Sequence, residues 1–138
     1  MHCLHLLRES AIREVLIAMA NDANDALERT INYLKERLDV HVSQDAPPNT
    51  KQIGAYVLVA RSGGWSNTFL DAPRFTVDCH DSTGEKAYAL ACSVRDVLLQ
   101  MPEYDDKASE VEINSFYRDD WADGYPIYSL HVHTIFNV

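Results

Sequence analysis

The clearest hydrophobic pattern in the chain lies between Tyr56 and Gln100. From Tyr56 to Ala60 the residues of both parities are apolar, which is typical of a strand inside a sheet. From Arg74 to His80 apolar and polar residues alternate, which predicts a strand with one buried face and one polar face. The segment Ser62–Pro73 between these strands carries two adjacent glycines, and we expect it to be a long loop.

A helix is predicted directly after the second strand. Ser82 and Glu85 have the spacing of a capping box, so the helix should begin there. Apolar residues then recur every three or four positions and form one stripe (Ala87, Ala91, Val94, Leu98 and Met101). Pro102 should end the helix, because the residue before a proline avoids the helical conformation.

Four further elements are predicted outside this segment. A helix should begin at Asn24 or Asp25 and run to about Leu38, with an apolar stripe made by Leu27, Ile31, Leu34 and Leu38. A short strand, Asp39–Ser43, follows it. Near the C-terminus, the polar loop Glu103–Lys107 precedes two strands, which are Glu110–Arg118 and Pro126–Val138. In the first of these, Val111, Ile113, Ser115 and Tyr117 should share one face.

The resulting order is α-β-β-β-α-β-β. It predicts an α+β fold, a two-layer sandwich in which two main helices cover one face of a mixed, mostly antiparallel sheet of about five strands. We expect a single domain over residues 24–138, preceded by an extension over residues 1–23. Ile12, Val15, Leu16 and Met19 could place a further amphipathic helix in that extension, although Met19 could also be the natural start.

Composition narrows the class of protein further. Apolar residues make up 46 % and charged residues 24 % of the chain, as in ordinary soluble domains, and we expect no membrane span and no secretion signal. The formal net charge of −9 argues against a nucleic-acid-binding surface, which needs clustered lysine and arginine. The three cysteines, Cys3, Cys79 and Cys92, lack metal-ligand pairing. We interpret Cys79 and Cys92 as small hydrophobic residues in or near the core, in a reducing compartment.

Three histidines raise the possibility of a metal-dependent enzyme. His131 and His133 lie two residues apart on a strand, so their side chains should project from the same face. His80 could join them if its strand is a neighbour, and Asp78 or Glu112 could supply a carboxylate; such a set would suit zinc. The alternative, which we favour, is a polar sheet face that happens to use histidine, with no cofactor and no catalysis.

The remaining candidates are aromatic. Trp65 and Trp121 are both expected on loops, where an exposed aromatic side chain can anchor an interface or fold back over the core. The predicted loop Ser62–Pro73 also carries Phe69 and Leu70, which are unfavourable in water. We therefore take Trp65, Phe69, Leu70, Trp121 and Tyr125 as candidate assembly-interface residues.

Taken together, the segments resemble the tail terminator, or tail completion, proteins of long-tailed bacteriophages and prophages. The resemblance covers about Asn24–Val138 and rests on the order of seven stretches. These are NDALERTINYLKERL, DVHVS, the proline-bearing QDAPPN, YVLVAR with its following glycines, RFTVDCH, GEKAYALACSVRDVLLQ and DDWADGYPIYSLHVHTIFNV.

The resemblance implies a structural virion protein and not an enzyme. Members of that family form a ring, typically of six subunits, on the head-proximal end of the tail tube, where they stop tube growth and join the tail to the head. The implied partners are other copies of the chain, the tail tube protein and a connector, with DNA passing through the ring. Assembly would take place in the bacterial cytoplasm. A neighbouring head-closure component of the same neck is the alternative.

Within such a ring, the polar sheet face would line the channel or contact a neighbouring subunit. Its candidate residues are Asp78, His80, Glu112, His131 and His133. An acidic channel would repel DNA phosphates and so ease passage.

Overall fold

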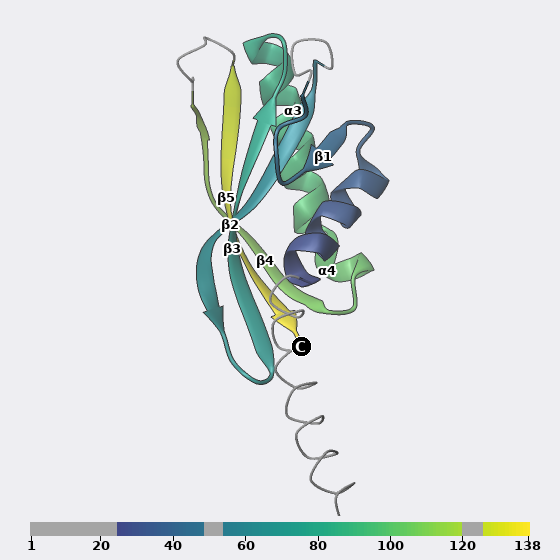
Figure 1. Ribbon diagram of the computed structural model, residues 1–138, viewed down its shortest axis with the longest axis vertical. Coiled ribbons are helices and arrows are strands. Elements are labelled where there is room, and N and C mark those ends of the chain that lie inside the picture. Colours follow the sequence, from purple (N-terminus) through teal and green to yellow (C-terminus); the bar gives the residue numbers. More distant parts are fainter. Residues whose placement is uncertain (1–24, 49–53, 120–125) are drawn as a thin grey trace, which may run out of the picture.

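One five-stranded sheet forms the framework of the protein (Figure 1). The computed structural model describes residues 25–48, 54–119 and 126–138. The strands are β1 (His41–Ser43), β2 (Tyr56–Ser66), β3 (Leu70–His80), β4 (Ala108–Arg118) and β5 (Ile127–Asn137). They lie in the order β1-β2-β3-β5-β4, with β1 parallel to β2 and every other pair antiparallel. The predicted α+β fold with a mixed, mostly antiparallel five-stranded sheet is confirmed.

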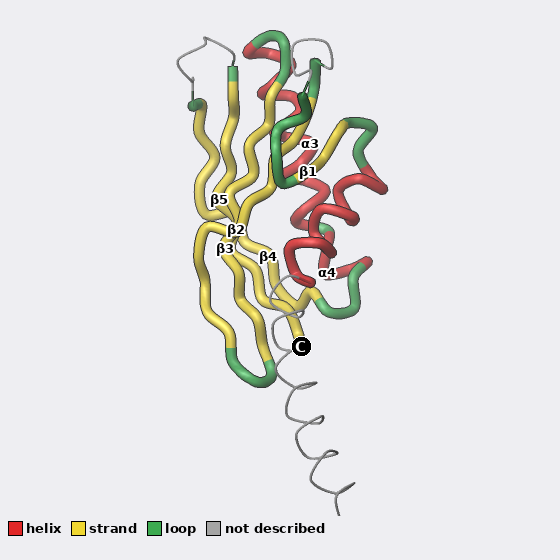
Figure 2. The backbone as a smooth tube through the Cα atoms, in the orientation of Figure 1, coloured by secondary structure: helices red, strands yellow, loops and turns green. Residues whose placement is uncertain are grey.

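The helices in the described part of the chain lie on one face of this sheet (Figure 2). They comprise residues 25–37, α3 (Gly84–Leu99) and the short α4 (Met101–Tyr104). The two main helices are those predicted, whereas α4 replaces part of the expected polar loop Glu103–Lys107. Pro102 stands in the first turn of α4, where its missing N–H is tolerated. No described helix is long and apolar enough to cross a membrane. The proposed extra helix falls within residues 1–24, outside the described residues.

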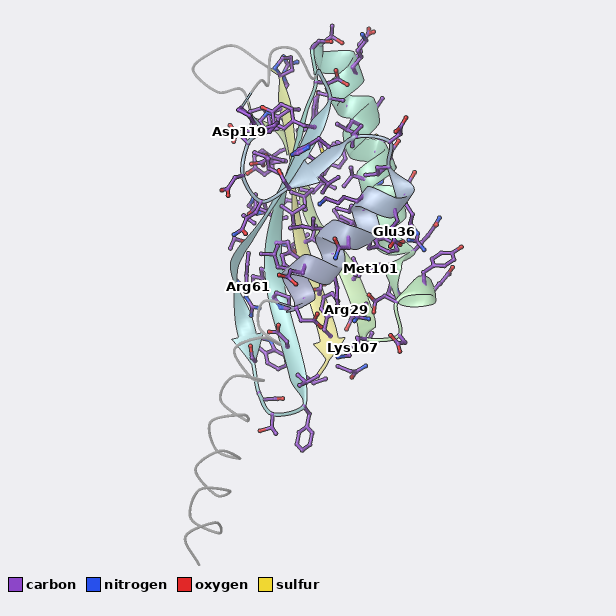
Figure 3. All side chains as sticks on the ribbon, turned by 45° about the vertical axis from the view of Figure 1, so that its right-hand side comes forward. Arg29, Glu36, Arg61, Met101, Lys107 and Asp119 are labelled. Carbon is purple, nitrogen blue, oxygen red and sulfur yellow. The ribbon has the colours of Figure 1, made fainter. Side chains whose placement is uncertain are left out.

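The core between the two layers is apolar and closely follows the predicted pattern. Val57 and Val59 from β2 face the helices, as do Phe75, Val77 and Cys79 from β3, and all five are buried. The predicted stripe of α3 lies against them, with Ala87, Ala91, Val94, Leu98 and Met101 at 0–1 % exposure. Met101, which is labelled in Figure 3, is the first residue of α4 and follows closely after the end of α3 at Leu99. Burial raises the pKa of the Cys79 thiol, so this residue acts as a small apolar core residue.

The structure corrects two details of the predicted helices. The N-cap of α3 is Thr83, whose hydroxyl accepts a hydrogen bond from the Lys86 N–H at 3.2 Å, so Ser82 does not form the expected capping box. The predicted stripe of the 25–37 helix is confirmed only in part: Leu34 is fully buried, whereas Leu27, Ile31 and Leu38 are partly buried against the core, and the other buried positions are Ala26, Thr30 and Tyr33. Hydrogen bonds satisfy the polar side chains among them: Thr30 donates to the Ala26 carbonyl and Tyr33 to the Val97 carbonyl.

The prediction of a long loop over Ser62–Pro73 is also wrong. Strands β2 and β3 continue through most of this segment and form a hairpin. A bulge between Arg61 and Gly63 shifts the register, and pairing then extends to Ser66 and Asp71. Gly64 makes the close pairing possible. Its φ is +111°, and a Cβ added there would lie 2.1 Å from the Ala72 carbonyl oxygen.

A second bulge changes which side chains of β4 face the core. The register shifts between Ile113 and Ser115, so the expected alternation fails after that point. Phe116, and not Tyr117, turns toward the helices and packs edge-on against Tyr88 at a ring distance of 5.7 Å. Tyr117 instead projects from the opposite face of the sheet, where its hydroxyl lies 3.1 Å from Nε2 of His131.

Candidate assembly interface

The β2–β3 hairpin extends beyond the helical layer at one end of the molecule (Figure 1). Its turn is held by Asn67, whose side-chain oxygen accepts hydrogen bonds from the N–H groups of Phe69 and Leu70 at 2.9 and 2.8 Å. The backbone N–H of Asn67 donates to the Leu70 carbonyl at 2.8 Å. The tip is therefore a defined turn and not a loose loop.

A largely buried ion pair braces the hairpin. The Arg61 guanidinium donates two hydrogen bonds to the Asp71 carboxylate, at 3.0 and 2.9 Å, and the Ser66 hydroxyl donates a third at 2.7 Å. Asp71 is only 3 % exposed. Two parallel bonds between guanidinium and carboxylate fix both distance and orientation, so this cluster links the two strands on the side that faces the helical layer. Arg61 lies on the part of β2 that leads into the hairpin (Figure 3).

The hairpin presents aromatic side chains to solvent. Trp65 is 51 % exposed and Phe69, in the turn, is 77 % exposed, whereas Leu70 is half-buried. These values place three of the five sequence-predicted interface residues on one projecting element. The other two, Trp121 and Tyr125, fall outside the described residues.

The face of the sheet opposite the helices, here called the open face, carries the polar candidates. Cross-strand neighbours form rows on it: Arg74 lies opposite His133, which lies opposite Glu112. A second row places Thr76 next to His131 and His131 next to Ser115. Rows of this kind bring side chains from three strands to within contact distance of one another.

A groove of about 190 Å³ lies on the open face beside Trp65. It is lined by Trp65, Ala72, Pro73, Arg74, Glu110, Glu112, His133, Thr134 and Ile135. Its walls therefore combine an indole, short apolar side chains and both signs of charge, a composition common in protein–protein contacts.

The rest of the open face is occupied by local pairs. Asp78 accepts a hydrogen bond from the Ser129 hydroxyl at 2.6 Å, and the ring of His80 stacks on Tyr56 with centroids 4.3 Å apart. The described residues thus place every candidate of the polar face (Asp78, His80, Glu112, His131 and His133) on the open face, as predicted.

The three histidines do not meet. β3 and β5 are neighbours, as the metal hypothesis required, but the register pairs His80 with Ile127, four residues from His131. Four strand residues span roughly 13 Å, too far for a shared ion bound at about 2 Å from each nitrogen. Within the described ranges, no group of three or more histidine, cysteine, aspartate or glutamate side chains has metal-binding geometry.

Several residues of this interface were missed by sequence reasoning. Arg61, Asp71 and Arg74 lay in or beside the expected loop, and nothing in their spacing indicated a cross-strand pair. The tandem Gly63-Gly64 was the available signal, since glycines in a strand often mark a bulge. Tyr117 was predicted on the wrong face of β4, because the bulge between Ile113 and Ser115 could not be recognised from the sequence.

A second ion-pair cluster stabilises the flank where the 25–37 helix meets the segment that follows α4. Arg29 donates to both carboxylate oxygens of Asp105, at 3.1 and 2.7 Å. Burial opposes ionisation of Asp105, but the bonds from Arg29 and the Lys107 N–H outweigh it and lower the pKa of Asp105. The neighbouring Asp106, by contrast, is a solvated turn residue with a side-chain exposure of 95 %. Figure 3 shows Arg29 and Lys107 on this flank.

Models of known protein families do not match this sequence, and neither do the sequences of curated proteins.

Proposed function

We propose that this chain is a structural virion protein that caps the head-proximal end of a phage tail tube as a ring. The observation that carries the proposal is the braced hairpin with Trp65 and Phe69 exposed on it. Aromatic side chains held on a rigid projecting element are typical anchors of protein interfaces. The element order, which is the basis of the resemblance to tail terminators, supports the same proposal.

The ring contact would be heterologous, so that different surfaces of two copies meet. The hairpin is one candidate surface, and the groove, which Trp65 also lines, is another. The open face would then line the channel or meet a neighbour. The net charge of −9 favours passage of DNA over binding, since like charges repel across the channel.

Deleting the gene from its phage or prophage tests this function. Negative-stain electron microscopy of the induced particles should show overlong tails of variable length, detached from filled heads. Tails of uniform length that fail to join heads would favour a connector of the same neck instead. Normal infectious particles would exclude a virion role.

A further inference from the structure

The sheet has two long edges that no strand of the described residues covers. β4 is the last strand in the order β1-β2-β3-β5-β4, so one side of its 11 residues has no partner strand. At the other edge, β1 pairs only with residues 56–58 of β2, and the hairpin half of β2 extends beyond it (Figure 1). We call the free side of β4 the β4 edge, and residues 59–66 of β2 the hairpin edge.

Both edges are open to solvent and suited to further pairing. Most residues of the hairpin edge are exposed, as are Glu110, Glu112 and Asn114 on the β4 edge. Neither strand contains a proline, which would remove a donor from a ladder of hydrogen bonds. A long edge of this kind presents a row of backbone N–H and C=O groups that another strand can bind.

The two edges differ in charge. The β4 edge carries Glu110 and Glu112, whereas the hairpin edge has no acidic residue. The exposed Arg74 pairs with Gly63, and its Cδ is 4.0 Å from the position that a Cβ on Gly63 would occupy. Because Gly63 has no side chain, nothing on it separates Arg74 from the hairpin edge. Opposite charges on facing strands favour pairing of the two different edges, whereas two β4 edges would bring glutamates together.

The strand directions also suit a junction of the two different edges. Three antiparallel steps lead from β2 through β3 and β5 to β4, so β4 runs opposite to β2. Rotation about an axis along the strands preserves their directions. The β4 edge of one copy therefore meets the hairpin edge of the next in the antiparallel sense, and the alternation of the sheet continues across the junction.

From these observations we infer that copies of this chain join edge to edge, with β4 of one copy pairing antiparallel to residues 59–66 of the next. Main-chain hydrogen bonds hold the two sheets together, and the contact sets Glu110 and Glu112 near Arg74 of the neighbouring copy. Each copy uses two different edges, so the contact repeats around a ring. The inference rests on the proposed function for the closed ring, and adds which surfaces form the subunit contact.

Two proteins that each carry one accessible cysteine test the pairing. One has Ser62→Cys and the other Asn114→Cys, both at exposed positions; both proteins also have Cys3→Ser and Cys92→Ser, while the buried Cys79 is kept. With a short bismaleimide, dimers should form when the two proteins are mixed and not from either protein alone. Dimers from Asn114→Cys alone as the main product would overturn the inference in favour of a β4–β4 contact. A mixture that gives no more dimer than either protein alone would contradict it.

Charge reversal tests which residues face each other. Arg74→Glu in both proteins should raise the concentration needed for half-maximal crosslinking about tenfold, because it replaces attraction to the glutamates of the β4 edge by repulsion. Adding Glu110→Lys and Glu112→Lys should reverse that loss. Lys35→Glu makes the same change in net charge at an exposed position of the 25–37 helix and should have no effect. An equal loss from Lys35→Glu, or no recovery in the combined variant, would contradict the inferred junction.

Hydrogen exchange of the unmodified protein over a dilution series does not depend on the exact register. Amides of both β4 and residues 59–66 should gain protection as the concentration rises. A gain in β4 alone would overturn the inference in favour of a β4–β4 contact, and no gain in either edge would contradict it. The gene deletion tests the tail function separately: protection of both edges, with normal particles in the absence of the gene, would uphold the pairing and exclude the virion role.

Discussion

At the base of the hairpin, the Arg61–Asp71 pair fixes the position of the exposed aromatics. The carboxylate is almost fully buried and receives three hydrogen bonds, so removing its charge leaves a guanidinium without its bidentate acceptor. Leaving one member of a buried pair behind is far more destabilising than losing an exposed pair.

Asp71→Asn should therefore reduce the free energy of unfolding by about 2–3 kcal/mol, somewhat less than for a fully buried pair because Arg61 keeps some contact with water. Urea unfolding measures the change. Asp106→Asn removes an exposed carboxylate of the same kind and should have almost no effect. Equal stability of the two variants would contradict the bracing role.

The Arg29–Asp105 pair predicts a pH dependence of stability. The pKa of Asp105 is lowered in the folded protein, so its contribution is fully present above the pKa of the unfolded chain, about 3.9, and is lost as pH falls through the lower folded value. The gap in unfolding free energy between the wild type and Asp105→Asn should be constant from about pH 5 to 7 and shrink below about pH 4. A gap that widens on acidification would refute the assigned partner.

At the scale of elements, the hairpin depends on one glycine. Any side chain at Gly64 meets the Ala72 carbonyl at 2.1 Å and also has an unfavourable positive φ. Gly64→Ala should destabilise the protein by about 2–3 kcal/mol, since backbone strain and steric overlap add. Gly54→Ala provides the control, because Gly54 also has positive φ but has open space around it, and only strain of about 1 kcal/mol applies there. Thermal unfolding of both variants separates the two effects.

The bulge in β4 makes a prediction about two adjacent aromatics. Phe116→Ala should lower the free energy of unfolding by about 2 kcal/mol, because Phe116 packs among Tyr88 and Tyr128. Tyr117→Ala should lower it by less than about 1 kcal/mol, because Tyr117 lies on the open face. Urea unfolding measures both changes. If Tyr117→Ala were the more destabilising variant, Tyr117 and not Phe116 would face the core, as the uninterrupted alternation of β4 predicts.

The elements that sequence reasoning placed well are those with an uninterrupted period. The α3 stripe and the alternation of β3 from Arg74 to His80 have the burial that their spacing predicts. The predictions failed where a β-bulge interrupts the alternation of buried and exposed residues along a strand. Bulges at Arg61 and Ile113 changed the length of a hairpin and the face of a strand, and a bulge depends on cross-strand pairing that a single segment does not reveal.

The exposed residues of the candidate interface were predicted from the sequence, but the residues that hold them in place were not. Composition and position indicated Trp65 and Phe69 as exposed aromatics, because both lie near turn-forming residues. Arg61 and Asp71, which hold them in place, were not indicated, because residues ten apart in sequence meet only once the hairpin register is known. The histidine cluster failed for the same reason: adjacent strands were anticipated, but their register was not.

At the scale of the whole molecule, the two faces of the sheet have different environments. The helical layer buries one face, while the open face and the projecting hairpin remain available for contacts. The proposed ring requires two different surfaces on each copy, and the braced hairpin at one end of the sheet could supply one of them.

Complementation of the gene deletion with hairpin variants tests this account most directly. The combined Trp65→Ala and Phe69→Ala variant should fold with nearly wild-type stability, because both side chains are exposed. It should nevertheless leave tails overlong and detached in electron micrographs. Tyr104→Ala, which removes an equally exposed aromatic from α4, should restore tails of normal length. If the hairpin variant also restores normal tails and infectivity, the hairpin is not the surface that ends tail growth.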